Sequence, residues 1–199
     1  MELATEPGLL SRPIDVGAYL RACPSRASTR GTFYQTLIDH TETKLGHVPS
    51  AIFDGVTQRR WVVFKQYPLR DFIQLVANVA GAVYESLPLA EALRRLGWIA
   101  YPVFSATMAG RVVLYALGNR LEDVLESAPR AYGLVLPESD VRVTLSERFC
   151  KMEMRAVYNF VDTYQFGVLE GTIREHGFRP RVEVKQLANL ADADFELRW

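Results

Sequence analysis

The chain has 199 residues, a length that suits one domain, and its 49% hydrophobic and 23% charged composition is ordinary for a globular protein. Lysine plus arginine and aspartate plus glutamate number 23 each, so the formal net charge is zero and the electrostatic attraction behind most nucleic-acid binding is missing. We therefore expect no nucleic-acid partner. The two cysteines, Cys23 and Cys150, form no CxxC pair, which argues against a disulfide framework and a structural zinc site.

Nothing in the sequence predicts export or membrane insertion. Met1–Gly8 has no basic region followed by an apolar run, so it does not resemble a signal peptide. The longest apolar candidate, Trp98–Leu117, is interrupted by Pro102, Gly110 and Arg111, whereas a membrane span needs roughly 18 uninterrupted apolar residues. We expect a cytoplasmic protein without a membrane span.

The first part of the chain is expected to be helical. Residues 1–29 should form a tail with one short helix over Ile14–Arg21. Thr29 is a candidate N-cap for a helix over Arg30–Leu45, which Gly46 would end in the left-handed conformation. The pattern leaves the state of the apolar run Trp61–Phe64 open.

The most regular helical spacing follows Pro68, with apolar residues at Leu69, Phe72, Ile73, Val76, Ala80 and Val83. Ser86 and Pro88 predict the start of the next helix, which Gly97 would end. Beyond Gly97 we expect helical turns over Tyr101–Ala109, a helix over Arg111–Leu117, and a helix over Arg120–Ser127 opened by a capping box of Asn119 and Glu122.

After Pro129 the period changes from helical to alternating, which predicts a sheet. A helix over Phe160–His176 separates two hairpins whose strands should span Val141–Ser146, Cys150–Ala156, Arg181–Leu187 and Phe195–Trp199. The predicted fold class is therefore α+β, a helical layer followed by a ββαββ four-stranded antiparallel sheet. We expect a single domain over 30–199, with a helical part at 30–133 and the ββαββ part at 140–199.

No standard catalytic motif is present: there is no GxSxG elbow, P-loop, HExxH pair or helix-opening GxGxxG. We therefore expect a protein that is not an enzyme. The three histidines offer no metal site, because His40 and His47 are expected at the surface and His176 is expected to cap the C-terminal helix.

Two patterns allow both a structural and a functional interpretation. Gly167 and Gly171 predict close packing of their helix on the sheet, or else a contact between two copies of the helix. Arg94 and Arg95 precede aromatic residues that belong either to the core or to the edge of a pocket, namely Trp98, Tyr101 and Phe104.

Arg70 and Arg111 each lie inside a strongly apolar segment, where a buried charge must be paired or face a cavity. The structural interpretation is an internal ion pair with Asp71, Glu85 or Glu91. The functional interpretation is recognition of an acidic group on a ligand.

Four segments together resemble a family of uncharacterised proteins that is multiplied as paralogues in myxobacteria. They are Tyr67–Asp71, Ala92–Gly97, Gly167–Gly171 and Asp194–Trp199, with the sequences YPLRD, ALRRLG, GVLEG and DFELRW. The resemblance covers most of the chain. It implies no activity, because the family has no known function.

At the level of the fold, helices followed by ββαββ are similar to H-NOX domains, to 4-vinyl-reductase-type sensors and to TRAPP subunits. The H-NOX likeness implies haem held by a proximal histidine ahead of the first strand, but Met108–Asp140 contains no histidine. It also implies a Tyr-x-Ser-x-Arg motif, which Tyr84 and Ser86 begin and Pro88 breaks. We therefore expect no cofactor, and we do not expect haem ligation of the H-NOX type, because the axial ligand is missing.

Two functions follow from these observations. The first is a non-enzymatic regulatory or sensory domain that holds a small, largely apolar ligand between helices and sheet, lined by Arg70, Trp98, Tyr101, Phe104, Arg111 and Tyr115. The second is a protein-interaction module, a homodimer or adaptor without a ligand. A cavity favours the first function, and a large apolar surface patch favours the second.

Overall fold

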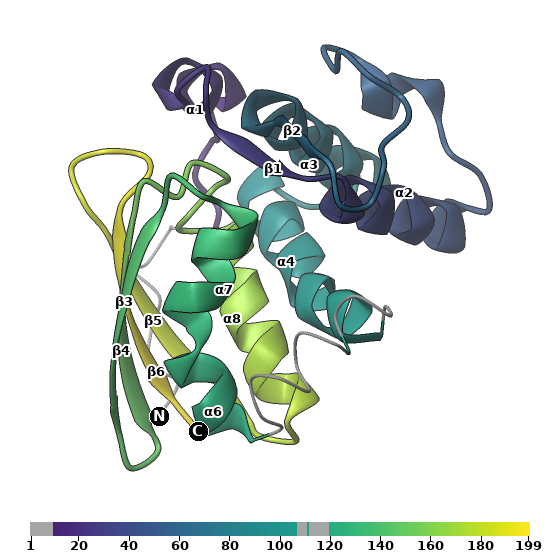
Figure 1. Cartoon of the computed structure of the whole chain (residues 1–199). Coiled ribbons are helices and arrows are strands. Elements are labelled where there is room, and N and C mark those ends of the chain that lie inside the picture. The colour runs from purple at the N-terminus through teal and green to yellow at the C-terminus, as the bar shows by residue number, and fades with distance from the viewer. Residues whose placement is uncertain (1–9, 107–110, 112–119) are drawn as a thin grey trace.

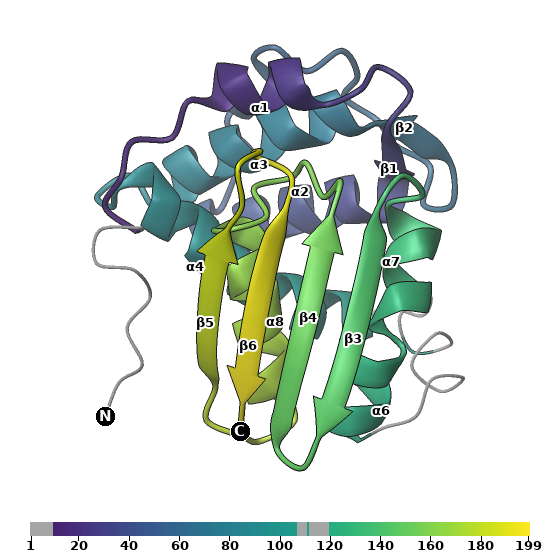
Figure 2. The same ribbon diagram turned by 90° about the vertical axis from the view of Figure 1, so that its left-hand side faces the viewer.

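The computed structural model describes residues 10–106, 111 and 120–199. In Figure 1 a four-stranded sheet forms one layer, and the helices α6 (Leu121–Glu126), α7 (Ala128–Val135) and α8 (Tyr164–Glu175) cover one of its faces. Figure 2 shows the opposite face of the sheet, across which no labelled helix lies. The expected helix over Arg111–Leu117 and the expected cap at Asn119 fall largely or wholly outside the described residues.

The sheet confirms the predicted ββαββ order. Its strands are β3 (Asp140–Ser146), β4 (Phe149–Arg155), β5 (Arg181–Gln186) and β6 (Ala193–Arg198), all paired antiparallel in the spatial order β3-β4-β6-β5. Alternate residues of β4 and β6 are buried, so one face of the sheet packs on the helices. The alternation of apolar and polar residues was a sufficient signal for all four strands.

The N-terminal half is not purely helical, which corrects the sequence-based expectation. Its helices are α1 (Val16–Ala22), α2 (Gly31–Leu45), α3 (Leu69–Val83) and α4 (Leu89–Ala106), with a short 3-10 helix, η1, at Ser50–Phe53. Between them, β1 (Ser28–Arg30) and β2 (Gln66–Pro68) pair as a two-stranded sheet. Thr29 therefore lies in a strand and is not the N-cap of α2, whereas Gly46 ends that helix in the left-handed conformation as expected. No described helix is long and apolar enough to cross a membrane.

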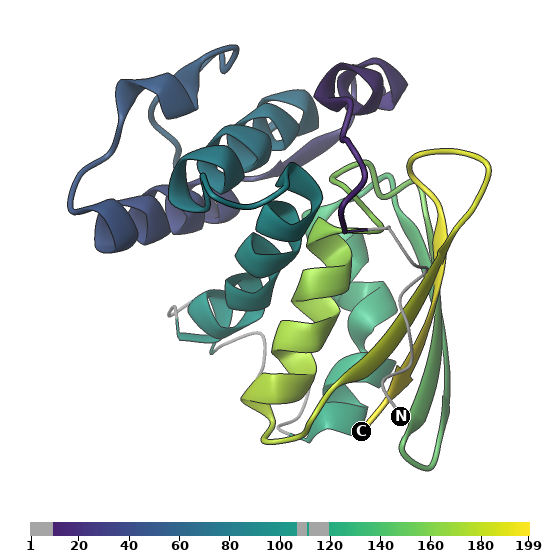
Figure 3. The same ribbon diagram turned by 180° about the vertical axis from the view of Figure 1, so that it is seen from behind.

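Helix α4 continues through Gly97, where the sequence predicted its end. Figure 3 shows α4 and α8 side by side, and Gly97 allows their backbones to come close. A β-carbon at Gly97 would lie 2.1 Å from the carbonyl oxygen of Tyr164, and one at Gly167 would lie 1.9 Å from that of Arg94. One at Gly171 would meet the carbonyl oxygen of Trp98 at 2.2 Å. The Gly167–Gly171 pair thus serves intramolecular packing, but against α4 and not against the sheet.

The connection from β4 to α8 is irregular and partly left-handed. Ala156 and Phe160 have positive φ values of 57° and 54°, a conformation that bulky residues rarely adopt. The left-handed Phe160 cannot belong to the helix, which is why α8 starts at Tyr164 and not at Phe160 as predicted. A buried ion pair between Arg12 and Asp162 holds this connection to the N-terminal segment.

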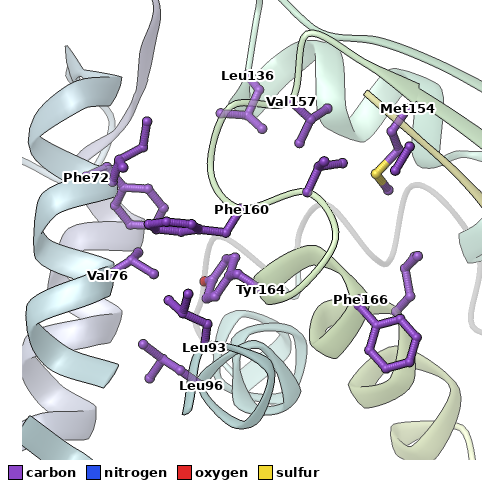
Figure 4. Close-up of a cluster of buried hydrophobic side chains, with 14 of the residues drawn as sticks. Phe72, Val76, Leu93, Leu96, Leu136, Met154, Val157, Phe160, Tyr164 and Phe166 are labelled. Atoms are coloured by element: carbon purple, nitrogen blue, oxygen red, sulfur yellow. The ribbon is translucent and has the colours of Figure 1, made fainter. Parts of the chain in front are cut away.

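The main core joins the two parts of the chain. Phe72 and Val76 from α3 and Leu93 and Leu96 from α4 are buried in the same cluster as the β4–α8 connection and the sheet (Figure 4). Phe160 is fully buried and stacks at a tilt on Tyr19, with 4.6 Å between ring centroids. The connection is therefore fixed by packing on both sides, which places its side chains firmly against the interior.

Candidate functional site

A cavity of about 760 Å³ lies between the helical part and the sheet part. Its walls come from α2, α3, α4, α6, α7 and α8, from β1 and β4, and from the segments around Val63 and Asn159. A volume of this size falls within the roughly 300–1,000 Å³ range of small-molecule sites. The cavity is thus large enough for a ligand of considerable size, in the layer where the sequence predicted one.

Most of the cavity wall is apolar. The apolar lining residues include Phe33, Phe72, Ala100, Val124, Leu125, Ala128, Val135, Leu136, Met152, Val168 and Leu169. Met152 projects from β4 and is fully buried, so the sheet itself contributes to the wall. Such a surface favours a ligand with a largely hydrocarbon body.

A few polar side chains interrupt this apolar wall. The hydroxyl group of Tyr132 on α7 donates a hydrogen bond of 2.7 Å to Oε1 of Gln165 on α8. Asn159 directly precedes Phe160 in the chain. The carbonyl oxygen of Phe160 accepts a hydrogen bond from the backbone amide of Gln165, which brings this part of the connection near Gln165. Asn159 is only 3% exposed, and its Oδ1 has no hydrogen-bond partner among the described residues.

Two tyrosines of the cavity lining are uncharged near neutral pH. Burial raises the pKa of Tyr132 and of Tyr164 well above the usual range of a phenol, so both keep their protons. Within the described lining the only formally charged residues are Arg30 and Asp39, and Asp39 is exposed. The described lining therefore offers a ligand mostly neutral donors and acceptors, with Arg30 and Asp39 as its two charges.

Arg30 bridges the two sides of the cavity mouth. Its Nε donates to the carbonyl oxygen of Leu134 at 3.1 Å, and a terminal nitrogen donates to that of Phe64 at 3.3 Å. Phe64 and Leu134 line the cavity and yet remain 69% and 48% exposed. The guanidinium of Arg30 thus links the backbones of two exposed apolar residues that line the cavity.

Of the residues predicted to bind a ligand, Tyr101 lines the cavity and Trp98 does not. Trp98 is half-buried outside it, where its indole nitrogen donates to Oε2 of Glu170 at 2.5 Å and its ring faces the guanidinium of Arg94 at 4.8 Å. The side chains of Phe104 and Tyr115 lie outside the described part of the chain.

The two arginines predicted as polar anchors are exposed, which corrects the expectation of buried charges. Arg70 occupies the first turn of α3, where its Nε donates to the carbonyl oxygen of Cys23 at 2.8 Å. Arg111 is also exposed, and neither residue belongs to the described cavity lining. The apolar spacing around Arg70 identified helix α3 but not which side of it faces solvent.

The histidines also differ from expectation in one case. His40 is buried, and burial followed by the charge of Lys44 lowers its pKa to about 4, so the expectation of a surface residue is wrong. His176 caps α8 as predicted, with 2.9 Å between its Nδ1 and the carbonyl oxygen of Thr172. No group of three or more potential metal ligands occurs among the residues that the structure describes.

Sequence reasoning missed the residues that give this cavity its polar character: Arg30, Tyr132, Asn159 and Gln165. Asn159 offered the only signal, because a polar residue stands there between the apolar aromatic positions Tyr158 and Phe160. The other three come together only when α7, α8 and β1 are placed in space.

Comparisons with known proteins agree with this fold. A family model described as a protein of unknown function, DUF2378, matches residues 25–199. None of the curated proteins matches the chain. Among solved structures, an Fe(II)-ligation-state mutant of an H-NOX protein from S. oneidensis aligns with a TM-score of 0.66 and 11% identity, covering 85% of this chain and 95% of that one.

Two further structures extend the likeness. The Fe(II) unliganded H-NOX protein from K. algicida has a TM-score of 0.63 at 12% identity, with 85% and 95% coverage. A protein described by the modulation of its heme redox potential through porphyrin distortion has a TM-score of 0.58 at 16% identity, with 85% and 97% coverage. Identities this low show the fold alone.

These neighbours overturn the expectations of no cofactor and of no haem. The second rested on one missing histidine in one sequence window, whereas the fold is shared with proteins described by Fe(II) and heme. The described lining also contains other side-chain types that hold haem iron in proteins, namely the tyrosines and Met152. Haem therefore belongs among the candidate ligands of this cavity.

Proposed function

We propose that this chain, which belongs to the DUF2378 family of proteins of unknown function, is a sensory domain that holds a small, largely apolar ligand in the cavity between its helices and its sheet. The observation that supports this most is the cavity itself, about 760 Å³ of largely apolar space with a few convergent polar groups. A concave, largely apolar space of this size with a few polar groups is the usual form of a small-molecule site.

The likeness to H-NOX structures supports a sensory role, because they share the fold over 85% of this chain. It also supports haem as one candidate occupant. If haem is bound, it would supply an iron for a small gas, and the tyrosines and Met152 are the described lining residues of types that hold haem iron. Tyr132 and Tyr164 would have to lose protons that burial favours, and Met152 is fully buried, so the fit of these residues to an iron is incomplete. A metal-free apolar molecule is the other candidate.

A fluorescent apolar probe tests the cavity as a binding site. Nile red should bind the native chain with one site and brighten on transfer from water. Ala131→Trp fills the cavity from α7 and should abolish this binding. Arg130→Trp changes the adjacent, exposed residue of the same helix, which does not line the cavity, and should leave binding unchanged. Equal binding by both variants would show that the probe sits elsewhere.

A protein-interaction role is the second candidate, and the exposed large hydrophobic residues favour it. Val62, Phe64 and Leu134 are the exposed large hydrophobics among the described residues, and the last two flank the cavity mouth. Sedimentation velocity would test this alternative. A homodimer that Phe64→Ser dissociates would support it, and a monomer at all concentrations would leave ligand binding as the better account.

A further inference from the structure

Resting on the proposed ligand-binding function, we infer that the ligand of this cavity carries a carboxylate on a large apolar body and that the guanidinium of Arg30 binds this carboxylate. Arg30 is the only cation in the described lining of the cavity. The rest of that lining is largely apolar and would hold the body of the ligand. The lining thus offers an anionic amphiphile one site for its charge and a larger surface for its hydrocarbon part.

The guanidinium of Arg30 has hydrogen-bond donors to spare. Its described hydrogen bonds go to the carbonyl oxygens of Leu134 and Phe64, and a guanidinium has more N–H groups than these two bonds use. The residue is half-buried, and none of its nitrogens is among the buried polar atoms without a partner, so its unused N–H groups are accessible. Leu134 and Phe64 themselves line the cavity, so the guanidinium lies against the cavity between them.

Among the described residues, the positive charge of Arg30 has no carboxylate partner. None of the ion pairs that the structure describes includes it. Asp39, the other charged residue of the described lining, is exposed and lies further along α2, at roughly 13 Å by the rise of the helix. This separation exceeds the screening length of about 8 Å at physiological salt, so Asp39 neither neutralises Arg30 nor strongly repels an anion bound to it.

The backbone holds Arg30 in position. Arg30 is the last residue of β1, where it pairs with Gln66 of β2, and it directly precedes α2. The next amide, that of Gly31, donates to the carbonyl oxygen of Lys65 at 2.9 Å, and a β-carbon at Gly31 would lie 2.2 Å from the carbonyl oxygen of Val62. This close packing fixes the base of the arginine side chain, so an anion meets a largely preorganised partner.

The charge and exposure of Arg30 favour a carboxylate over other anions. A carboxylate carries one charge and matches the planar fork of a guanidinium. A phosphate group carries up to two charges and would need a second cation, which the described lining lacks. Because Arg30 is only half-buried, a carboxylate bound to it keeps part of its hydration, which limits the desolvation cost. We therefore assign the ligand to the carboxylic acids with a large apolar body.

Two fluorescent probes with the same aromatic body and opposite charges test this inference at pH 7. 1-Pyrenebutyrate is an anion and 4-(1-pyrenyl)butylammonium is a cation, so Arg30 and Asp39 predict opposite preferences between them. We expect the native chain to bind the anion about 5–10-fold more tightly, the difference that a charge-assisted hydrogen bond makes at a partly exposed site. A higher salt concentration should reduce this preference.

A matched pair of variants locates the effect. Arg30→Gln removes the charge but keeps an amide donor for the carbonyl oxygens of Leu134 and Phe64, and it should abolish the preference for the anion. Arg60→Gln makes the same change at an exposed residue that does not line the described cavity, and it should keep the native preference. The neutral probe 4-(1-pyrenyl)butanol should bind the native chain and both variants equally, which shows that the cavity is intact.

Two further ligands distinguish the possible sources of the carboxylate. Laurate carries it on a hydrocarbon chain, and haem carries it on a porphyrin ring. Loss of the fluorescence of bound 1-pyrenebutyrate on adding laurate would assign a fatty acid. A haem absorption band that is stronger with the native chain than with Arg30→Gln would assign the porphyrin. If neither result is obtained, the assigned ligand class is wrong.

The outcomes separate this inference from the proposed function. Equal binding of the two charged probes by the native chain, or tighter binding of the cation, overturns the carboxylate assignment and leaves the cavity as an apolar binding site. A preference for the anion that persists in Arg30→Gln overturns the role of Arg30. If none of the three pyrene probes binds, both the inference and the proposed function fail. The comparison on the native chain needs no variant, so it decides the carboxylate assignment even if Arg30→Gln does not fold.

Discussion

Glu170 on α8 accepts two hydrogen bonds of 2.7 Å from the guanidinium of Arg94 on α4. The side chains are only 10% and 20% exposed, so this bidentate pair is largely shielded from solvent. Although burial alone would lower the pKa of Arg94, its hydrogen bonds and charge contacts with Glu170 and Glu91 raise it. The pair lies beside the glycine crossing of α4 and α8 and fixes how the two parts of the chain meet.

Removing the carboxylate from this pair should destabilise the protein. Glu170→Gln keeps the size of the side chain but strands the guanidinium of Arg94, at a cost of about 1–3 kcal/mol in the free energy of unfolding. Glu175→Gln, on the same helix but exposed, should change it by less than about 0.5 kcal/mol. Urea unfolding of both variants measures the difference, and equal stabilities would contradict the structural role of the pair.

Replacing glycine by alanine should change the stability of the protein in opposite directions at two sites, one inside the crossing of α4 and α8 and one outside it. Gly171→Ala would place a methyl group 2.2 Å from the carbonyl oxygen of Trp98, so the helices must separate, and we expect a loss of about 1–3 kcal/mol or more. Gly81→Ala, within α3 with no atom near the new methyl group, should gain about 0.5–1 kcal/mol from helix propensity. Thermal and urea unfolding check both, and a stable Gly171→Ala variant would be inconsistent with the close crossing.

His40 should make the protein sensitive to acid. Its pKa falls from about 6.5 in the unfolded chain to about 4 in the folded one, so the unfolded state binds the extra proton between these values. Stability should therefore be unaffected above pH 6.5 and decline as the pH falls toward 4. His40→Gln should flatten this part of the profile, whereas His47→Gln, at an exposed position, should not. A native profile with no difference from His40→Gln would refute the burial argument.

The exposed positions of Arg70 and Arg111 predict small effects. Arg70→Met removes one hydrogen bond to a carbonyl oxygen and should cost about 1 kcal/mol or less, and Arg111→Met should be nearly neutral. Neither change should weaken Nile red binding, because neither residue lines the cavity. A loss of about 3–5 kcal/mol in thermal melts would instead indicate a buried ion pair, as the sequence alone suggested.

Local patterns predicted the elements of this fold better than their contacts. The alternation of Val141, Val143 and Leu145 is visible in the sequence because one face of the sheet is buried. Gly97 was misread as a helix end because its role, close approach to α8, depends on a segment about 70 residues away. The pairing of β1 with β2 likewise joins segments that are far apart in the sequence, so a local pattern does not reveal it.

The candidate site was less predictable than the fold for a related reason. Tyr101, one of the residues that the sequence suggested for a ligand site, lines the cavity, but an arginine among apolar residues can lie on either side of a helix. The unpaired amide of Asn159 can be recognised only when all its neighbours are known. Binding residues supplied by several elements carry no common sequence period, so they appear only in three dimensions.

The central claim, that the cavity holds a ligand, is tested most directly by native mass spectrometry of the freshly purified chain, with an absorption spectrum of the same sample. We predict a mass above that of the polypeptide by one bound molecule, lost on denaturation and absent from Ala131→Trp. A Soret band would identify that molecule as haem, and its absence would indicate a metal-free apolar ligand. A native mass equal to that of the polypeptide alone, together with no binding of Nile red, would contradict the account.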